Sequence, residues 1–498
     1  MDARQQLLDD LAAGRTTTEQ LVDRVVRIEA QLQAALQRIA ELEAKTPPPP
    51  TLDYSMNAEE KRQKARGRKP RKLKITRRGR IKTADKIPLA KYTVDVYPTG
   101  LDPTVCWHSH TRVLWQLDEH RHAILVAYRI FRGPEDRYGI IPGAMGASEY
   151  RMDIAATIAH LVYVVGLSFD KVCGVLQFFQ NLPLKKSQLD AILRHLAKSW
   201  EREFETLANL LANSAIVNGD ETGWSLKSVW AFASEQAQIV LYGVPKDAET
   251  LQKILDPATF QGLLISDDAA VYENFTTAQK CWAHLIRKAI KLTLVEAQNE
   301  TYRTITDELL EIYRRACAAR NDGRLGDAGR ASRVDELTVA LYELCQPHWH
   351  PEAAPSTGHA NTFRLLINEL MRLLEAGELF TFVTTPDSAQ PNGASKAAPG
   401  TNNEAERILR NPAEARKTGR TSKTSAGARR QTIIMSVLSS LRKYLSEYTL
   451  SNVLDEIQNW WKSGRSCFEK WRKKLKIPVA KTSVLDQLYP PLVADPSG

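Results

Sequence analysis

Two aspartates stand at positions where the sequence could bind divalent metal ions. Asp220 and Asp267 each follow an apolar run that predicts a β-strand, in the segments SAIVNGD and GLLISD. A carboxylate at a strand end lies at the edge of a sheet, where the backbone fixes it and a cation can reach it. Two such carboxylates on neighbouring strands repel each other and raise one pKa, unless a cation such as Mg²⁺ lies between them. The pair therefore predicts a metal site.

A third acid would complete two metal sites. The segment GTNNEAERILR supplies it, because Asn402 or Asn403 can cap a helix whose first turn contains Glu404 and Glu406. Two divalent ions about 4 Å apart can activate a water or a 3′-hydroxyl and stabilise the leaving oxygen of a phosphodiester. The predicted chemistry is therefore attack on a phosphodiester bond, with two Mg²⁺ or Mn²⁺ ions per active site.

Short β-branched and aromatic segments must position the first two acids. SAIVNGDETGW, SVWAFAS and QIVLYGV predict three strands, DAETLQKIL predicts a helix, and GLLISD predicts a fourth strand. A ribonuclease-H-like α/β domain begins with three strands, a helix and a fourth strand, although many α/β domains share this order. We therefore expect an α/β core with the acids at the edge of its sheet.

Four short motifs, taken in order, give a more specific indication. They are GDETGW, SDDAAVY, CWAHLIRK and TNNEAER. Together they resemble the insertion sequence 66 family of bacterial DDE transposases, which typically show D-E-T, D-x-x-x-x-Y, C-x-x-H-x-x-R and N-N-x-x-E-R in the same order. The likeness covers most of residues 150 to 450. It implies an enzyme that cleaves DNA at the ends of a mobile element and transfers the freed 3′-hydroxyl to target DNA.

The resemblance also assigns roles to individual residues. Matched motif by motif, it implies three catalytic metal ligands, which are Asp220, Asp267 and Glu406. Asp268 and Glu404 are neighbours that the family pattern does not require, and they remain alternatives. The spacing to Tyr272 selects Asp267 over Asp268, and the adjacency of Arg407 selects Glu406 over Glu404.

Cys281 and His284 resemble a C-x-x-H signature that several transposase families with a helical insertion share. Such a pair could also be half of a zinc site, but the sequence offers no second half, so we predict a structural or DNA-positioning role and no zinc. Tyr272 and Asn403 belong to the same positional set. Arg287, on the helix predicted after the pair, could contact a phosphate.

Helical patterns separate the second and third acids. TYRTITDELLEIYRRACAAR, RVDELTVALYELC and FRLLINELMRLLEAG show 3.6-residue apolar spacing. The resemblance implies an insertion domain here; a separate helical domain is the alternative. After Glu406, a cationic and hydroxyl-rich stretch suits a DNA backbone, although it could be solvated surface. Its predicted DNA contacts are Arg407, Arg410, Arg416, Lys417 and Arg420.

The N-terminal region predicts self-association followed by a basic linker. Seven apolar residues at alternating spacings of four and three predict a short coiled coil, and hence a homodimer or larger assembly; a lone amphipathic helix is the alternative. They are Leu21, Val25, Ile28, Leu32, Ala35, Ile39 and Leu42. Prolines 47 to 50 then stop the helix.

Thirteen Lys or Arg and no acid lie between Lys61 and Lys82, so this stretch carries the net charge of +10. Double-stranded DNA is its expected partner. The core RGRKP resembles a minor-groove AT-hook, but Lys69 stands where that motif has proline, and a solvating linker is the alternative. Its predicted contacts are Arg66, Arg68, Lys69 and Arg71. Relatives often carry a cysteine-rich zinc module in this region, and here the C-x-x-C pairs are missing.

Two further regions precede the first acid. TRVLWQL and HAILVAYRIF predict a strand pair, and its scattered cysteine and histidines have no C-x-x-C, so we expect no zinc site there. Beyond it, Ser168 is expected to cap FDKVCGVLQFFQ, and Ser187 to cap QLDAILRHLAKSW. The two helices could form a helix-turn-helix, with Lys186 and Arg194 facing DNA, or an ordinary helical hairpin.

The expected fold class is α/β plus α: a ribonuclease-H-like catalytic domain interrupted by a helical insertion, preceded by a coiled coil, a basic linker, and a β-containing then helical DNA-binding region. The expected domains are a coiled coil (1–46), a Pro-rich and basic DNA-binding linker (47–84), a small β-rich domain (85–150), a helical domain with the candidate helix-turn-helix (151–212), a first catalytic part (213–295), a helical insertion (296–384), a second catalytic part with the third acid (385–450) and a C-terminal helical tail (451–498).

Composition excludes several classes of protein. The chain is 43% hydrophobic and 25% charged, and no apolar run reaches the roughly 18 residues of a membrane helix, so we expect no membrane partner. The acidic start lacks a secretory pattern, and six scattered cysteines suit a reducing compartment. We expect a bacterial cytoplasmic protein associated with the nucleoid, with accessory proteins as additional partners. A nuclease without joining activity and an inactive DNA-binding derivative are the alternative functions.

Overall fold

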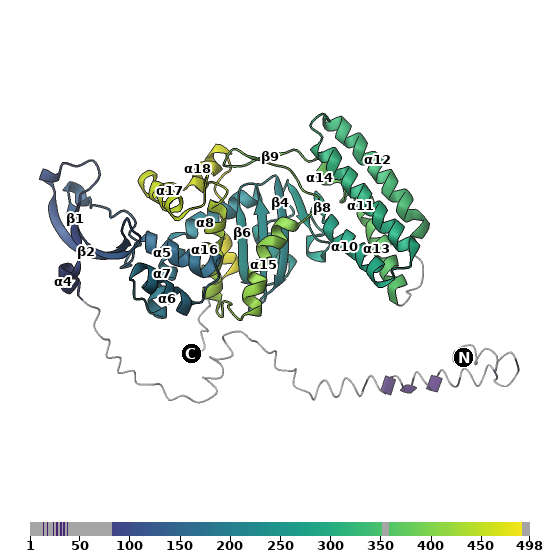
Figure 1. Ribbon diagram of the computed structural model, residues 1–498, viewed down its shortest axis with the longest axis horizontal. Helices are drawn as coiled ribbons and strands as arrows, with labels where there is room; N and C mark the ends of the chain where they lie inside the picture. Colours follow the sequence, from purple (N-terminus) through teal and green to yellow (C-terminus); the bar gives the residue numbers. More distant parts are fainter. Residues whose placement is uncertain are drawn as a thin grey trace. The chain divides into compact units, whose positions relative to one another are not determined.

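The computed structural model describes residues 82–350 and 358–490, together with isolated positions between residues 13 and 37. The chain divides into two units, Met1–Arg71 and Lys72–Gly498. All seven seam residues of the predicted coiled coil, and the predicted DNA contacts Arg66, Arg68, Lys69 and Arg71, lie outside the described residues. The labelled helices and strands in Figure 1 all belong to the second unit. Within the described part, no helix is long and apolar enough to cross a membrane.

A small three-stranded sheet comes first. A short helix α4 (Thr83–Lys86) and the 3-10 turn Ile87–Leu89 precede it; its strands are β1 (Tyr92–Val96), β2 (Trp107–Leu117) and β3 (Ala123–Arg132). The order is β1-β3-β2, with β2 antiparallel and β1 parallel to β3. The β2–β3 pair is the strand pair that the sequence predicts. Leu114, Val126 and Ile130 form its own small apolar core, because alternate residues of each strand face one side.

Four helices follow: α5 (Met152–Ala159), which continues as the π-helical turn His160–Val164, α6 (Phe169–Gln180), α7 (Lys186–Ser199) and α8 (Glu201–Ala212). Ser168 caps α6 as predicted, accepting a hydrogen bond from the N–H of Lys171. The prediction that Ser187 caps α7 is wrong, since the helix already begins at Lys186. The side chain of Gln188 instead accepts the N–H of Lys185 at 2.9 Å, so the helix can start two residues earlier.

The central sheet has five strands: β4 (Ile216–Gly223), β5 (Ser228–Ser234), β6 (Gln238–Val244), β7 (Leu263–Ser266) and β8 (Ala278–Lys280). Their order is β6-β5-β4-β7-β8; β4, β5 and β6 are antiparallel neighbours, whereas β7 and β8 run parallel to β4. Helix α9 (Ala248–Ile254) joins β6 to β7 (Figure 1). The predicted succession of three strands, a helix and a fourth strand is therefore present.

One detail of the sheet differs from the prediction. Asp267 directly follows β7, as expected, but Asp220 does not end its strand. The strand β4 continues to Gly223, because Glu221 pairs with Trp230 and Gly223 pairs with Ser228 on β5. Only the apolar part of β4 stops before Asp220, and the hydrogen-bonded ladder extends three residues farther.

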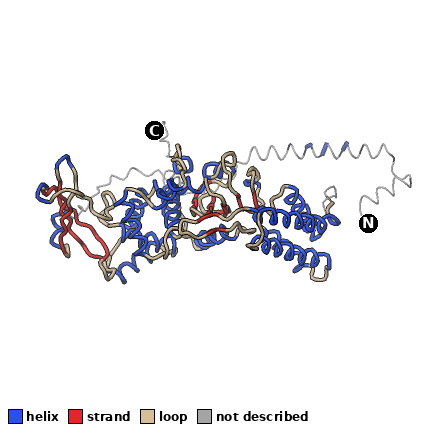
Figure 2. The backbone as a smooth tube through the Cα atoms, turned by 90° about the horizontal axis from the view of Figure 1, so that it is seen from above, coloured by secondary structure: helices blue, strands red, loops and turns tan. Residues whose placement is uncertain are grey.

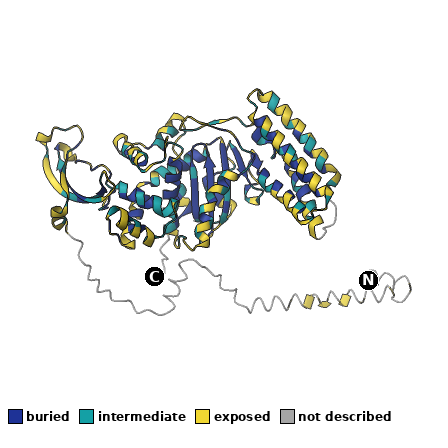
Figure 3. Cartoon of the chain, in the orientation of Figure 1, coloured by how far each residue is buried: buried dark blue, intermediate teal, exposed yellow. Residues whose placement is uncertain are grey.

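The largest apolar core lies between the central sheet and the helices that pack on it. Helix α16 (Ser425–Leu441) contacts β6, α7 and α8, and helix α15 (Asn403–Lys417) contacts β4 and β5. The tail is helical and packs back on this body through α17 (Leu450–Ser463), α18 (Cys467–Lys474) and α19 (Val484–Leu488). Figure 3 shows the central strands as the most buried part of the molecule.

A helical insertion lies between Asp267 and Glu406 in the sequence. Its helices are α10 (Trp282–Val295), α11 (Glu300–Asn321), α12 (Asp327–Cys345), α13 (Gly358–Glu375) and α14 (Thr381–Thr384), followed by the short strands β9 (Ser388–Ala389) and β10 (Ser395–Lys396). Figure 2 shows these helices in blue beside the red strands of the sheet. Their apolar residues form a second core, which includes Ile216, Leu263 and Ile265 of the central sheet. The insertion is thus anchored on the strands that lead to the two aspartates.

Candidate active site

Asp220 and Asp267 lie on neighbouring parallel strands. Asn218 of β4 pairs with Ile265 of β7, and this register, continued two residues farther, places Asp220 level with Asp267. Each carboxylate also accepts a backbone N–H nearby: Asp220 from Glu221 at 2.8 Å, and Asp267 from Ala269 at 3.2 Å. The register therefore places the two acids beside each other on adjacent segments of the sheet.

The pKa of Asp220 reflects the negative charges of the other two candidate ligands. Burial, followed by the negative charges of Glu221, Asp267 and Glu406, raises this pKa to about 7, although the backbone hydrogen bond from Glu221 lowers it. The charges of both other predicted ligands thus act on this carboxyl group. A divalent cation would relieve the repulsion, and an all-carboxylate set is what Mg²⁺ or Mn²⁺ prefers. The donor chemistry of the three acids fits the expected ions.

Glu406 lies in the first turn of α15, and the start of that helix is fixed by Asn402. The fully buried Asn402 side chain donates to the carbonyl of Gly219 at 2.7 Å, and its backbone N–H donates to the Sγ of Cys281 at 3.1 Å. Asn402 thus ties α15 to the strand that carries Asp220. Asn403, the predicted positional residue, is the exposed first residue of the helix, so the anchoring belongs to its neighbour.

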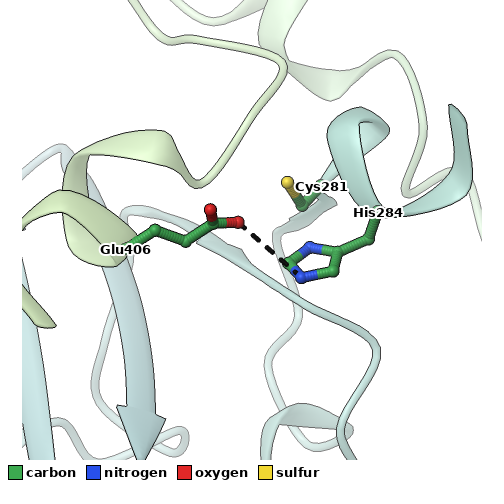
Figure 4. Close-up of side chains that lie close together, drawn as sticks. All are labelled: Cys281, His284 and Glu406. Atoms are coloured by element: carbon green, nitrogen blue, oxygen red, sulfur yellow. Dashed lines mark ion pairs between the residues drawn. The ribbon is translucent and has the colours of Figure 1, made fainter. Parts of the chain in front are cut away.

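The Glu406 carboxylate is oriented toward the insertion. It accepts hydrogen bonds from Arg287 at 2.9 and 3.2 Å, and its Oε1 lies 3.7 Å from the Nε2 of His284. Cys281, His284 and Glu406 form a group in which the candidate ligand atoms all lie within 4.8 Å of one another (Figure 4). Asp220 and Asp267 are not part of this group. Sequence reasoning missed it, because no local spacing links Glu406 to a C-x-x-H pair.

Tyr272 has a specific structural role. Its fully buried hydroxyl donates a hydrogen bond to Glu221, and burial together with the charge of Glu221 raises its pKa well above the usual value. Glu221 also pairs with Lys246 at 2.7 Å. The segment after Asp267 is therefore locked to β4 beside Asp220. Sequence reasoning missed Glu221 and Lys246, although the D-E-T motif contained the signal for Glu221.

The two alternative acids already have partners. Asp268 pairs with Arg372 of α13. Glu404 pairs with Lys396 at 2.6 Å and Lys443 at 3.4 Å, and although burial raises its pKa, these two cations bring the net value below normal. Both carboxylates serve as structural ion-pair partners. Glu406 is also paired, with Arg287, so these contacts do not decide between Glu404 and Glu406.

A cavity of about 660 Å³ opens beside Asp267, between the sheet and helices α10 and α13. Three of its lining residues carry a buried polar atom without a hydrogen-bond partner: the Nζ of Lys280, the Nδ1 of His284 and the Oδ1 of Asn368. An unsatisfied buried polar atom is costly, and several in one cavity indicate that a polar ligand completes them.

The predicted DNA contacts on α15 fall into two groups. Arg407, Arg410 and Lys417 are exposed, and no partner is seen for them among the described residues. Arg416 instead donates to the carbonyl of Gly223 at 2.6 Å, and Arg420, beyond the helix, donates to that of Gly166. The first three are therefore available for phosphates, whereas the other two hold neighbouring backbone segments.

The three remaining predicted DNA contacts that the structure describes form ion pairs within the chain. Lys186 on α7 pairs with Asp170 at 2.7 Å, and Arg194 pairs with Asp190 at 3.1 Å. Helix α7 also packs against α5 and α16 with its apolar face. Arg287 is held by Glu406.

Comparison with known proteins identifies a family. A family model described as the IS66 family of transposases matches residues 148–430, which is more than half of the chain and includes all three predicted metal ligands. No curated protein matches the chain.

Proposed function

Because the chain belongs to the IS66 family of transposases, we propose that it cleaves DNA at the ends of a mobile element and joins the freed 3′-hydroxyls to target DNA. The observation that carries this proposal is the family match over residues 148–430, which includes Asp220, Asp267 and Glu406; the register of β4 and β7 and the raised pKa of Asp220 support it. Three carboxylates from distant parts of the chain converge closely enough to influence one another. Such convergence is costly unless cations compensate it.

The proposed catalytic core is ribonuclease-H-like. Its sheet has the order β6-β5-β4-β7-β8, with three antiparallel strands followed by two parallel ones. The acids come from the centre of this sheet and from α15, and helices α10–α14 interrupt the core between the second and third acid. This arrangement supports a catalytic domain split by an insertion, with the third acid supplied from beyond it.

Asp220, Asp267 and Glu406 would hold two Mg²⁺ or Mn²⁺ ions. When bound, these ions activate the attacking hydroxyl and stabilise the leaving oxygen of the phosphodiester. Asp220, whose pKa is about 7, must lose its proton before it can bind a cation. Glu406 must give up its contacts with Arg287 and His284 to do so. Asn402 and Tyr272 keep the segments that carry the acids in register with β4.

DNA is the proposed partner. The exposed Arg407, Arg410 and Lys417 offer phosphate contacts on the same helix as Glu406. The basic stretch from Lys61 to Lys82 would add affinity that falls steeply with salt. We also propose that the chain self-associates through the heptad repeat and that accessory proteins take part. Its proposed location is the bacterial nucleoid, in the cytoplasm.

The decisive experiment uses labelled DNA fragments that carry the ends of the encoding element, with Mg²⁺ or Mn²⁺. The wild-type chain should cleave and join these ends. Asp267→Ala should lose about three orders of magnitude in rate and still bind DNA, because Lewis-acid stabilisation is worth several kcal/mol. The matched control is Asp307→Ala, an exposed aspartate on α11, which should retain activity.

Each outcome is informative. Equal activity of wild type and Asp267→Ala would refute the catalytic assignment. Cleavage without any joined product would identify a nuclease, and DNA binding without cleavage in either metal would identify an inactive derivative.

A further inference from the structure

We propose that Cys281, His284 and Glu406 form a separate site for Zn²⁺, and that a bound zinc ion withdraws Glu406 from the catalytic acids. The first part concerns a metal site that stands on its own geometry. The second part, inhibition, rests on the proposed function. The motif C-x-x-H supplies two ligands, and the fold adds the third from a residue far along the chain.

The geometry of the three ligands suits a transition metal. Cys281 directly precedes α10, and His284 lies in its first turn, so their side chains face the same side. Glu406 reaches them from the first turn of α15, and all three ligand atoms lie within 4.8 Å of one another (Figure 4). Three protein ligands leave a fourth tetrahedral position for water, as in open zinc sites.

The ligand atoms are available for a metal. The Nδ1 of His284 is buried and has no hydrogen-bond partner. The Sγ of Cys281 accepts the backbone N–H of Asn402 at 3.1 Å. Burial nevertheless raises the pKa of this thiol, so the sulfur loses its proton only when a metal ion binds. Arg287 donates to Glu406 and would remain as an outer partner that orients this ligand. On binding, the Cys281 proton passes to solvent as the sulfur–metal bond forms.

The ligand set decides which metal binds. Mg²⁺ takes hard oxygen ligands and would leave the sulfur and nitrogen unused, whereas Zn²⁺ binds thiolate, imidazole and carboxylate together. The proposed catalytic set and the zinc site therefore have different preferences, and they share only Glu406. Occupancy of the zinc site holds this carboxylate beside Cys281 and His284, away from Asp220 and Asp267.

The binding test uses the metal-free full-length chain titrated with Co²⁺ as a spectroscopic probe for zinc. We expect a thiolate-to-cobalt charge-transfer band and tetrahedral visible bands, both abolished by one equivalent of Zn²⁺. Cys281→Ser should lose the charge-transfer band, and His284→Ala should bind at least about tenfold more weakly, which corresponds to one lost ligand. The matched control Cys173→Ser should keep both bands.

Thermal melting of each metal-free variant shows that it is folded before titration. If His284→Ala does not fold, Glu406→Gln provides the same comparison on an exposed helix turn. Absence of the charge-transfer band in wild type, or an equal band in Cys281→Ser, would overturn the site.

The inhibition test measures Mg²⁺-dependent cleavage with and without Zn²⁺, each variant relative to its own zinc-free rate. One equivalent of zinc should lower the wild-type rate at least about tenfold, and a chelator should restore it. Cys281→Ser should lose less than about twofold of its own rate, because the remaining ligands bind zinc weakly. A wild-type rate insensitive to bound zinc would overturn the inhibition. If the wild type binds Co²⁺ as expected but never cleaves DNA, the proposed function is refuted and the proposed metal site still holds.

Discussion

At the scale of single residues, the central fact is a carboxyl group whose surroundings disfavour its charge. Asp220 is partly buried, and the charges of Glu221, Asp267 and Glu406 add to the effect of burial. Lys246 forms its ion pair with Glu221, at 2.7 Å. The free protein therefore carries an electrostatic strain at its candidate site, and divalent cations would remove it.

This strain predicts how stability depends on pH. The pKa of Asp220 is raised from 3.8 to about 7 in the folded state, so the folded protein binds this proton more tightly than the unfolded chain. The stabilisation of the folded state that this bound proton provides is complete below about pH 4 and is lost as the pH rises through 7. Metal-free protein should thus lose stability between about pH 4 and pH 7 through this group, and Asp220→Asn should flatten that slope in urea titrations. Mg²⁺ should stabilise wild type more at pH 8 than at pH 5.5, and equal stabilisation at both pH values would contradict the assignment.

The sequence predicts part of this site and misses the rest for a physical reason. Asp220 and Asp267 can be identified from the sequence, because the strand pattern and the position of an acid after it are local properties. The contacts of Glu406 with Arg287 and His284 join segments about 120 residues apart, and no local spacing encodes them. The hydrogen bond from Asn402 to Gly219 also joins segments that are distant in the sequence, and the sequence alone indicates Asn403 for the positional role instead.

At the scale of elements, helix α16 protects the free edge of the sheet. Strand β6 has a strand neighbour on one side only, and its outward N–H groups would otherwise remain unpaired. Three buried hydroxyls, one per helical turn, accept these N–H groups: Ser440 from Gln238, Ser436 from Val240 and Thr432 from Tyr242, at 2.9 to 3.0 Å. The helix thus takes the place of a sixth strand.

Removing one hydroxyl should expose the cost of an unpaired N–H. Ser436→Ala should lower the free energy of unfolding by about 1–3 kcal/mol, since the N–H of Val240 is then buried without a partner. Denaturant unfolding measures this change. Ser439→Ala is the matched control, because Ser439 is buried on the same helix and its hydroxyl has no hydrogen-bond partner among the described residues. This change should cost less than about 0.5 kcal/mol. Equal losses in the two variants would show that the hydroxyl does not satisfy the strand.

Periodicity predicts the elements better than their ends. The helical insertion and four of the five strands of the central sheet are visible in the sequence as apolar runs, whereas the three-residue strand β8 is not. Where α7 starts depends on Gln188, and where β4 ends depends on its pairing with β5. Such ends are decided by hydrogen bonds to other segments, which periodicity does not contain.

At the scale of the whole molecule, one sheet belongs to two cores. The helices α5–α8 and α16 pack in the larger core, whereas Ile216, Leu263 and Ile265 of the same sheet belong to the core of the insertion. Asp267 follows a strand that contributes to both. A movement of the insertion would therefore shift Asp267. It would also shift Glu406, through the contacts of this residue with Arg287 and His284.

The N-terminal region should add association without adding stability to this body. Every buried core residue in the described part of the chain lies at Val96 or beyond, and we therefore expect the folded unit to be stable without residues 1–46. Deleting residues 1–46 should convert a dimer or larger species to a monomer in sedimentation experiments, and the melting temperature should stay within about 2 °C. Ile28→Glu with Leu32→Glu, which places charges in the heptad seam at full length, should give the same monomer. A deletion that remains oligomeric would move association to the body, and a clearly lower melting temperature would favour a lone amphipathic helix packed on its own chain.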